Sequence, residues 1–219
     1  MFLAIVPAYN EQQHIGSVVR SLFQHVDQVV VIDDCSEDAT VEVAKAAGAT
    51  VICHAINRGQ GAALETGHDY ARQIGADVIL HFDGDGQFDV ADIRPALEAL
   101  KQSGADVLFG SRFLDNRTQI PAVKKYLLFP LARLFQRVWA ETPLSDTHNG
   151  FRLLTSHALH QIFITQDRMA HAVEMPSLVA RQRLRCIEFP VRVEYREYGL
   201  GMVGGVRIVK DLLVGRFVS

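Results

Sequence analysis

Few cysteines, no long apolar run and almost no excess charge characterise this 219-residue sequence. Its three cysteines, Cys35, Cys53 and Cys186, have no C-x-x-C spacing and cannot all pair, which favours a reducing compartment. No stretch approaches the roughly 20 apolar residues that cross a bilayer. We therefore expect a protein without a transmembrane helix, either soluble or lying on a membrane surface.

The N-terminus and the charge balance exclude two further classes. Residues 1–6 contain no cation, whereas a secretory signal peptide begins with a basic region. The net charge of −3 is too close to neutral for a dedicated nucleic-acid binder. With 48% hydrophobic and 21% charged residues, the composition is that of a globular protein that buries a core. We expect a cytoplasmic protein with no nucleic-acid partner.

Short apolar runs alternate with helical patterns through the first half of the chain. The predicted strands cover residues 2–6, 28–32, 50–53, 77–82 and 106–109, and the predicted helices 15–26, 40–47, 61–74 and 90–102. This alternation predicts an α/β fold with a mostly parallel central sheet and helices on both faces. Beyond residue 112 the predicted elements are a polar turn (145–152), two helices (158–164 and 172–185) and a strand (187–195) that Pro190 places near a sheet edge.

Polar or glycine-rich clusters follow all five predicted strands. They are residues 7–11, 33–34, 57–61, 83–87 and 110–112. Because ligands of open α/β sheets bind beyond the carboxyl ends of the strands, we expect one edge of the sheet to carry the chemistry.

The acidic turn Asp83-Gly84-Asp85 carries the most information. Two carboxylates this close repel each other, and a divalent cation removes that penalty. Mg²⁺ or Mn²⁺ prefers such oxygen ligands and often joins them to substrate phosphates. A solvated acidic turn is the alternative for an isolated D-x-D. A calcium loop fits poorly, because its twelfth position is Arg94 instead of glutamate.

Two other clusters each leave two interpretations open. Asp33 and Asp34 either cap the following helix or accept hydrogen bonds from a nucleobase or a ribose. The small residues after Asn57 and Arg58, Gly61 among them, either let a ligand approach the backbone or form a simple junction between loop and helix.

The motifs, taken in order, resemble the family 2 glycosyltransferases of the GT-A fold. They are P-A-Y-N-E, D-D-C-S-E-D-A-T, N-R-G-Q-G-A-A-L, D-G-D-G-Q and G-S-R-F. The run from Ser145 to Arg152 is similar to the D-T-x-x-G-F-R segment of polyprenyl-phosphate sugar transferases, a group that includes dolichyl-phosphate mannosyltransferase. Glu174-Met175 and the run 188–191 resemble the C-terminal catalytic region of that group. Cys35 departs from the pattern, because glycine is common at its position.

The resemblance implies a donor pocket and a metal site. The implied donor-binding residues are Pro7, Ala8, Tyr9, Glu11, Asp33, Asp34, Asn57, Gly61, Asp83 and Gly84. A Mg²⁺ or Mn²⁺ ion would bind Asp83, Asp85 and Gln87 and stabilise the leaving diphosphate. The implied catalytic residues are Asp85, Asp146, Arg112, Arg117 and Arg152.

The acceptor side needs cations more than a base if the acceptor is a lipid phosphate. Such a phosphate has a second pKa of about 6 and is largely dianionic at neutral pH. The candidate cations are Arg117, on a predicted mobile lid, together with Lys124, Lys125 and Arg152. Arg112 either stabilises the leaving diphosphate or forms a structural ion pair. Asp146 either orients the acceptor, acts as a base or caps a turn.

Two amphipathic segments bear on membrane contact. Residues 121–140 and 206–217 each combine an apolar stripe with opposing basic residues. Such helices either lie in the bilayer interface or pack against the sheet.

We expect a single GT-A domain over residues 1–219, with a nucleotide-sugar-binding half (1–112) and an acceptor and lid half (113–219). The predicted function is metal-dependent, inverting transfer of a sugar from a UDP- or GDP-linked donor to a polyprenyl phosphate. This transfer would occur at the cytoplasmic face of the membrane, with or without a membrane-embedded partner protein. The alternatives are a family 2 enzyme that glycosylates a sugar hydroxyl, and a non-catalytic sugar-nucleotide-binding protein. A nucleotidyltransferase fits less well, because its usual glycine-rich, basic N-terminal loop is missing.

Overall fold

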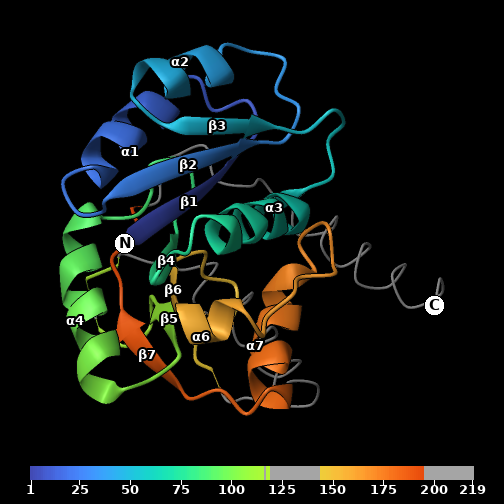
Figure 1. The fold of residues 1–219 in the computed structure, drawn as a ribbon. Coiled ribbons are helices and arrows are strands. Elements are labelled where there is room, and N and C mark those ends of the chain that lie inside the picture. The colour runs from blue at the N-terminus through green and yellow to red at the C-terminus, as the bar shows by residue number, and fades with distance from the viewer. Residues whose placement is uncertain (116, 119–143, 195–219) are drawn as a thin grey trace, which may run out of the picture.

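The computed structural model describes residues 1–115, 117–118 and 144–194. In this part of the chain, seven strands form one sheet in the order β3-β2-β1-β4-β6-β5-β7 (Figure 1). The strands are β1 (Phe2–Ala8), β2 (Gln28–Asp33), β3 (Thr50–Cys53), β4 (Val78–His81), β5 (Val107–Ser111), β6 (Arg152–Thr155) and β7 (Cys186–Pro190). The helices are α1 (Ile15–Leu22), α2 (Thr40–Ala46), α3 (Gln60–Gln73), α4 (Ile93–Ser103), α6 (Ser156–Leu159) and α7 (His171–Arg181), with a 3₁₀ turn at Val90–Asp92.

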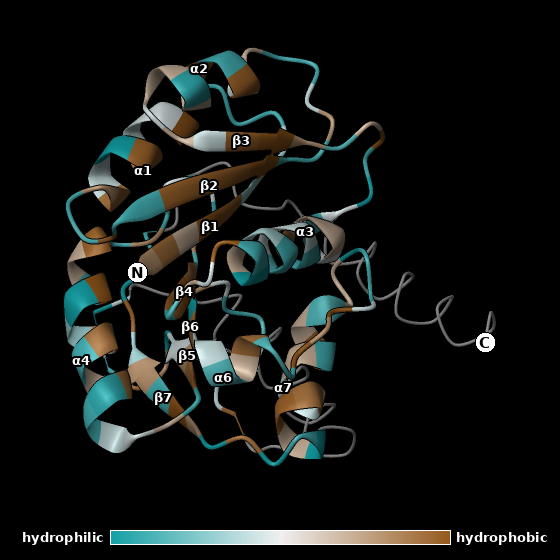
Figure 2. Ribbon diagram, viewed as in Figure 1, coloured by the Kyte–Doolittle hydropathy of each residue, from teal (hydrophilic) through white to brown (hydrophobic). Residues whose placement is uncertain are grey.

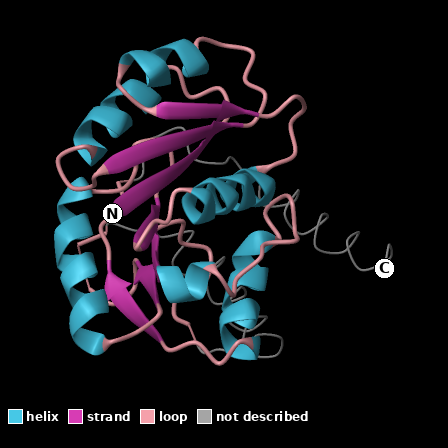
Figure 3. Cartoon of the chain, in the orientation of Figure 1, coloured by secondary structure: helices cyan, strands magenta, loops and turns pink. Residues whose placement is uncertain are grey.

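Helices cover both faces of the sheet, as predicted (Figure 3). Alternate residues of each strand face opposite layers. Val6 therefore packs in a core with Val18 of α1 and Leu97 of α4, whereas Ile5 packs with Leu64 of α3 and Met175 of α7. Figure 2 shows the result as apolar strands between helices with one apolar and one polar side. Burial on both faces explains why the central strands β1 and β2 are nearly continuous apolar runs.

One strand escaped the sequence-based prediction. Residues 152–155 follow the polar run 145–151, and we predicted a turn up to residue 152. They form β6, which runs antiparallel to both of its neighbours, β4 and β5. Leu153 and Leu154 are fully buried on opposite faces of the sheet. Four residues show too little periodicity to separate a buried strand from part of a loop or a helix.

The elements after β6 also differ in length from the prediction. The helix predicted at 158–164 is the single turn α6, and the one predicted at 172–185 ends at Arg181. The strand predicted at 187–195 is β7, which pairs only with β5 among the described strands. Pro190 therefore does lie on an edge strand. Because β6 and β7 join the sheet of the first half, both halves of the described chain share one sheet.

Sheet topology brings the predicted site residues to one edge. The parallel strands β1, β2, β4 and β5 all end there, and antiparallel β6 begins there at Arg152. The strand order reverses between β1 and β4, since β2 and β3 extend the sheet to one side and the later strands to the other. Ligands of open α/β sheets bind at such a reversal. Within the described residues, no helix is both long and apolar enough to cross a membrane.

Candidate active site

The Asp83 carboxylate lies just beyond β4, on the far side of the reversal from β1. Gln60, the first residue of α3, donates a hydrogen bond from Nε2 to Asp83 Oδ1 at 2.8 Å. Burial and the nearby Asp85 carboxylate raise the pKa of Asp83 to about 7. Asp85 Oδ1 accepts a hydrogen bond from the backbone N–H of Gln87 at 2.9 Å, which closes the acidic turn. The Asp85 charge therefore opposes ionisation of Asp83, and the hydrogen bond from Gln60 and the charges of Arg152 and Arg112 offset this only in part.

Arg152 is the buried cation of the site. Only 1% of its surface is exposed, although it is the most hydrophilic residue of β6. Its Nη2 donates to the carbonyl of Thr147 at 3.3 Å, while Nε and Nη1 have no partner among the described residues. Burial lowers the pKa of Arg152 to about 10, and the charges of Asp83 and Asp146 oppose that shift. A side chain so enclosed stabilises the nearby carboxylates of Asp83 and Asp146. In this conformation it does not reach a phosphate acceptor in solution.

Gly150 lies directly against the Asp83 carboxylate. A Cβ atom at Gly150 would come within 2.6 Å of Asp83 Oδ1 and 2.7 Å of its Cγ, and closer still to Oδ2. Real Cβ atoms essentially never approach that closely. Any side chain at this position would therefore displace the carboxylate.

The oxygen ligands that Asp83 and Asp85 offer suit a divalent cation whose remaining ligands come in part from the substrate. Asp83 and Asp85 supply hard oxygen ligands, and their mutual repulsion is the penalty that a cation removes. The described residues contain no group of three or more His, Cys, Asp or Glu side chains placed to hold a metal. Further ligands would have to be amide, phosphate or water oxygens. This is the coordination Mg²⁺ prefers, with one or two carboxylates beside substrate phosphates.

Arg112 and Asp146 form a nearly buried ion pair. Arg112 Nε donates to Asp146 Oδ2 and Nη2 donates to Oδ1, both at 2.6 Å. The backbone N–H of Arg112 and the Nδ2 of Asn149 also donate to Oδ2. Of the two interpretations of Arg112, the structure shows the ion pair. Both oxygens of Asp146 accept hydrogen bonds, so neither is available as a base in this conformation.

Arg117 is fixed by three groups. Its side chain donates to the carboxylates of Asp92 and Asp115, each at 2.6 Å, and to the carbonyl of Pro190 at 2.7 Å. Thr118 also bonds to the chain just beyond β7, because its hydroxyl donates to the Val191 carbonyl and accepts the N–H of Val193. The predicted lid residue therefore ties the segment after β5 to the end of β7.

The two aspartates at the end of β2 have different surroundings. Asp34 accepts hydrogen bonds from the N–H groups of Arg58 and Gly59, at 2.9 and 2.6 Å, and binds the ring of His54. Asn57 adds a hydrogen bond to the Asp34 carbonyl. Asp33 Oδ2 accepts only from the N–H of Ser36, and its Oδ1 is buried with no partner among the described residues. Asp34 thus holds the loop before α3, whereas the Oδ1 atom of Asp33 can still accept a hydrogen bond from a ligand.

The missing side chain of Gly61 lets another segment of the protein, residues 166–167, pack closely against the start of α3. A Cβ there would collide with the carbonyl of Gln166, and the neighbouring Ala62 N–H donates to the Asp167 carbonyl at 3.0 Å. The start of α3 is therefore capped by residues 166–167, which occupy the space beside Gly61 that a ligand would take under the first of the two interpretations.

The run after β1 lies beside the acidic turn. Gly84 packs against the carbonyl of Pro7, where a Cβ would lie 3.2 Å from the oxygen. The Ala8 carbonyl accepts the N–H of Asp34. The Tyr9 side chain, directly after β1, is 46% exposed. Burial, and then the charge of Asp85, raises the pKa of the Glu11 carboxyl, so Glu11 belongs to the same acidic group.

Cys35 shows why glycine is common at its position. Its φ angle is +66°, in the left-handed region that favours glycine. The turn is kept, and its Sγ lies 3.7 Å from the Ala55 carbonyl.

Gln60 and Gly150 were absent from the predicted site residues, although both touch Asp83. Each belongs to a motif that the sequence showed, N-R-G-Q-G and D-T-H-N-G-F-R, but nothing in a linear pattern connects either residue to an aspartate far along the chain. Lys124, Lys125 and the segments 121–140 and 206–217 lie outside the described residues.

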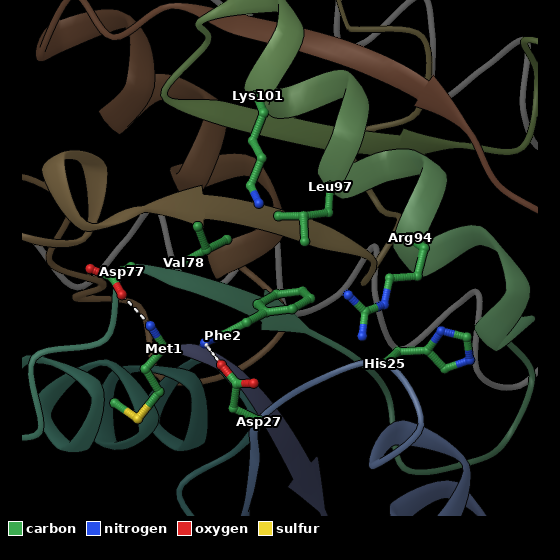
Figure 4. A pocket seen from close by; sticks show the side chains of 9 residues that line it. All are labelled: Met1, Phe2, His25, Asp27, Asp77, Val78, Arg94, Leu97 and Lys101. Carbon is green, nitrogen blue, oxygen red and sulfur yellow. Dashed lines mark hydrogen bonds and ion pairs between the residues drawn. The ribbon is translucent and has the colours of Figure 1, made fainter.

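A separate pocket opens at the opposite edge of the sheet (Figure 4). It encloses about 260 Å³ near the amino ends of β1 and β4, where the N-terminal ammonium pairs with Asp77 and the Phe2 N–H donates to Asp27. Arg94, Leu97 and Lys101 of α4 line its other side. This pocket contains none of the predicted site residues.

Comparison with solved structures identifies the fold. Glucosyl-3-phosphoglycerate synthase from Mycobacterium tuberculosis, solved with Mn²⁺, UDP and phosphoglyceric acid, superimposes with a TM-score of 0.73 at 19% identity. The match covers 99% of this chain and 78% of that one. The fold is therefore the GT-A fold of glycosyltransferases.

Sequence relatives define the family. The chain matches Glycosyl transferase family 2 over residues 3–163, and it belongs to that family. It is 31% identical to the uncharacterized protein MJ1222 of Methanocaldococcus jannaschii, over 96% of this chain and 90% of that protein. It is 26% identical to the UDP-N-acetylglucosamine–dolichyl-phosphate N-acetylglucosaminyltransferase of Methanococcus voltae, over 96% and 94% of the two chains. The protein is a glycosyltransferase.

The ion pair between Arg112 and Asp146 gives a stability prediction. Arg112→Met leaves the Asp146 carboxylate buried without its cation, which typically lowers the free energy of unfolding by about 3–5 kcal/mol. We expect urea denaturation to show a loss of this size. The double variant with Asp146→Leu removes both charges and should recover most of it. A stable Arg112→Met protein that had lost only activity would instead assign Arg112 to catalysis.

Proposed function

We propose that this enzyme transfers a sugar from a UDP- or GDP-linked donor to a polyprenyl phosphate, with inversion at the anomeric carbon. The observation that carries the metal-dependent part of the proposal is the pair Asp83 and Asp85, two half-buried carboxylates that repel each other at the reversal of strand order. A Mg²⁺ or Mn²⁺ ion bound there would supply positive charge to the leaving diphosphate. The printed name of the Methanococcus voltae relative, a transferase to dolichyl phosphate, supports the acceptor.

The residues at the sheet edge suggest how the donor binds. Asp33 Oδ1 is a buried acceptor without a hydrogen-bond donor among the described residues. A buried acceptor without a hydrogen bond destabilises the protein, and a bound ligand that donates to it removes that penalty. A nucleobase N–H would satisfy it. Pro7 and Ala8 end β1 at the same edge of the sheet, Tyr9 and Glu11 follow them, and Gln87 has an amide oxygen two residues beyond Asp85.

The reaction we propose is a single displacement. An oxygen of the lipid phosphate attacks the anomeric carbon while the bond from that carbon to the donor diphosphate breaks, and the nucleoside diphosphate leaves. A dianionic phosphate has no proton to lose, so no general base is required. This agrees with an Asp146 whose oxygens are both bound by Arg112. A sugar hydroxyl acceptor would need such a base, which makes that alternative less favourable.

We further propose that transfer takes place at the cytoplasmic face of the membrane and that residues 113–219 form the acceptor half. A lipid-linked phosphate requires the enzyme to work at a bilayer surface. The basic, amphipathic character of residues 121–140 and 206–217 supports contact with that surface, directly or through a membrane partner.

A donor and acceptor panel tests the function. Radiolabelled UDP-N-acetylglucosamine, UDP-glucose and GDP-mannose are each incubated with polyprenyl phosphate and Mn²⁺, and products are extracted into organic solvent. We expect one donor to label the lipid, and Asp85→Ala to abolish labelling without lowering the unfolding temperature. Label found only on added water-soluble sugars would refute the lipid acceptor. Full turnover with excess chelator would refute the metal.

The pKa of Asp83 predicts the pH dependence of metal binding. Because a proton and the metal compete for a carboxylate with a pKa of about 7, Mn²⁺ affinity should fall about tenfold per unit as pH drops below 7. Above pH 7 it should level off. Titration of Mn²⁺ followed by its electron paramagnetic resonance signal measures this. An affinity that stays flat between pH 8 and pH 5.5 would contradict the assignment of Asp83 as a ligand.

Asp33→Asn tests the base-binding residue. It exchanges a charged acceptor for an amide, and loss of one hydrogen bond to a charged group corresponds to a rise of about 10- to 100-fold in the donor KM. The matched control is Asp27→Asn, at the opposite edge of the sheet, which should leave the KM unchanged. An unaltered donor KM in Asp33→Asn would remove Asp33 from the pocket.

A further inference from the structure

Asp83 is restrained from two sides by residues that belong to distant parts of the chain. On one side the amide of Gln60 donates to Oδ1 at 2.8 Å. On the other side the bare α-carbon of Gly150 leaves only enough room for the carboxylate itself. A half-buried carboxylate that accepts a hydrogen bond at one oxygen and packs against the Gly150 backbone has little freedom to rotate.

The support for Gln60 is itself rigid. Gln60 begins α3, and the Asp167 carbonyl caps that helix end through the N–H of Ala62. The segment carrying Asp167 is held in turn, because Glu65 accepts the N–H of Ile164 at 2.6 Å. Glu174 of α7 accepts the N–H groups of Thr165 and Gln166. A continuous set of hydrogen bonds therefore runs from α7 to the acidic turn.

The support for Gly150 comes from the loop before β6. Asn149 donates to Asp146 through Nδ2 at 3.3 Å and accepts the N–H of Phe151 at 2.9 Å. The ion pair between Arg112 and Asp146 fixes this loop to the end of β5. Gly150 is thus held between two anchored residues, and its φ angle lies outside the left-handed region. The three atoms nearest to a Cβ placed there all belong to Asp83.

We propose that Gln60 and Gly150 are positioning residues that hold the Asp83 carboxylate in the orientation a divalent cation requires. This inference rests on the proposed metal-dependent function. Neither residue contacts the reacting groups in this proposal; each acts through Asp83. A carboxylate fixed before the metal arrives loses less conformational freedom on binding, so preorganisation adds to metal affinity.

The test measures Mn²⁺ binding to the full-length protein without substrate, from the electron paramagnetic resonance signal of free Mn²⁺. Gln60→Met keeps the length of the side chain but removes the donor, and we expect about tenfold weaker binding. Gly150→Ala should weaken binding at least as much. The matched control is Gln73→Met, an exposed glutamine at the other end of α3, which should bind Mn²⁺ as the wild type does.

Steady-state kinetics then separate positioning from general damage. Both site variants should lose turnover at a fixed low Mn²⁺ concentration and regain it as Mn²⁺ is raised, with the acceptor KM unchanged. Wild-type Mn²⁺ affinity in Gln60→Met would overturn the role of Gln60, and the same result in Gly150→Ala would overturn that of Gly150. Because Gln60 is partly exposed, Gln60→Met gives an answer even if Gly150→Ala fails to fold.

The two levels of the proposal fail differently. If the wild type binds no Mn²⁺ and needs none for transfer, the proposed metal-dependent function fails. If the wild type binds Mn²⁺ and both site variants bind it equally well, the function stands and the positioning role is refuted.

Discussion

The site depends on one electrostatic constraint, a half-buried carboxylate that has another carboxylate beside it. Asp83 and Asp85 repel each other in a poorly solvated turn, and the protein compensates only in part. Arg152 supplies a buried positive charge that interacts with Asp83 and Asp146, and Asp146 in turn pairs with Arg112. The charge still uncompensated is what a divalent cation, and through it a diphosphate, would use.

This arrangement requires the antiparallel strand β6. Because β6 lies between β4 and β5, its first residue, Arg152, pairs with His81 on one side and Phe109 on the other. The loop leading into β6 therefore passes the ends of both strands. Gly150 therefore contacts Asp83, just after β4, and Asp146 pairs with Arg112, just after β5. A parallel strand inserted here would begin at the other edge of the sheet and place this loop far from the acidic turn.

Residues that look alike in the sequence have separate tasks in the fold. Asp33 and Asp34 are adjacent, yet Asp34 holds the loop before α3, while one oxygen of Asp33 has no hydrogen-bond partner in the part of the chain that the structure describes. Arg112, Arg117 and Arg152 all resembled anion-binding cations, but the structure gives the first two carboxylate partners and buries the third. Sequence patterns report residue type and spacing. They do not report which residue each side chain contacts in the folded protein.

The sequence by itself determined the alternation of strands and helices, the sheet edge that carries the polar clusters, and the acidic turn, because these follow from local periodicity and from where apolar runs end. Tertiary structure alone decided that residues 152–155 form a central strand and that Gln60 and Gly150 meet Asp83. It also decided that the start of α3 is covered by residues 166–167. Such contacts join segments tens of residues apart, and their geometry depends on strand order, which no local pattern encodes.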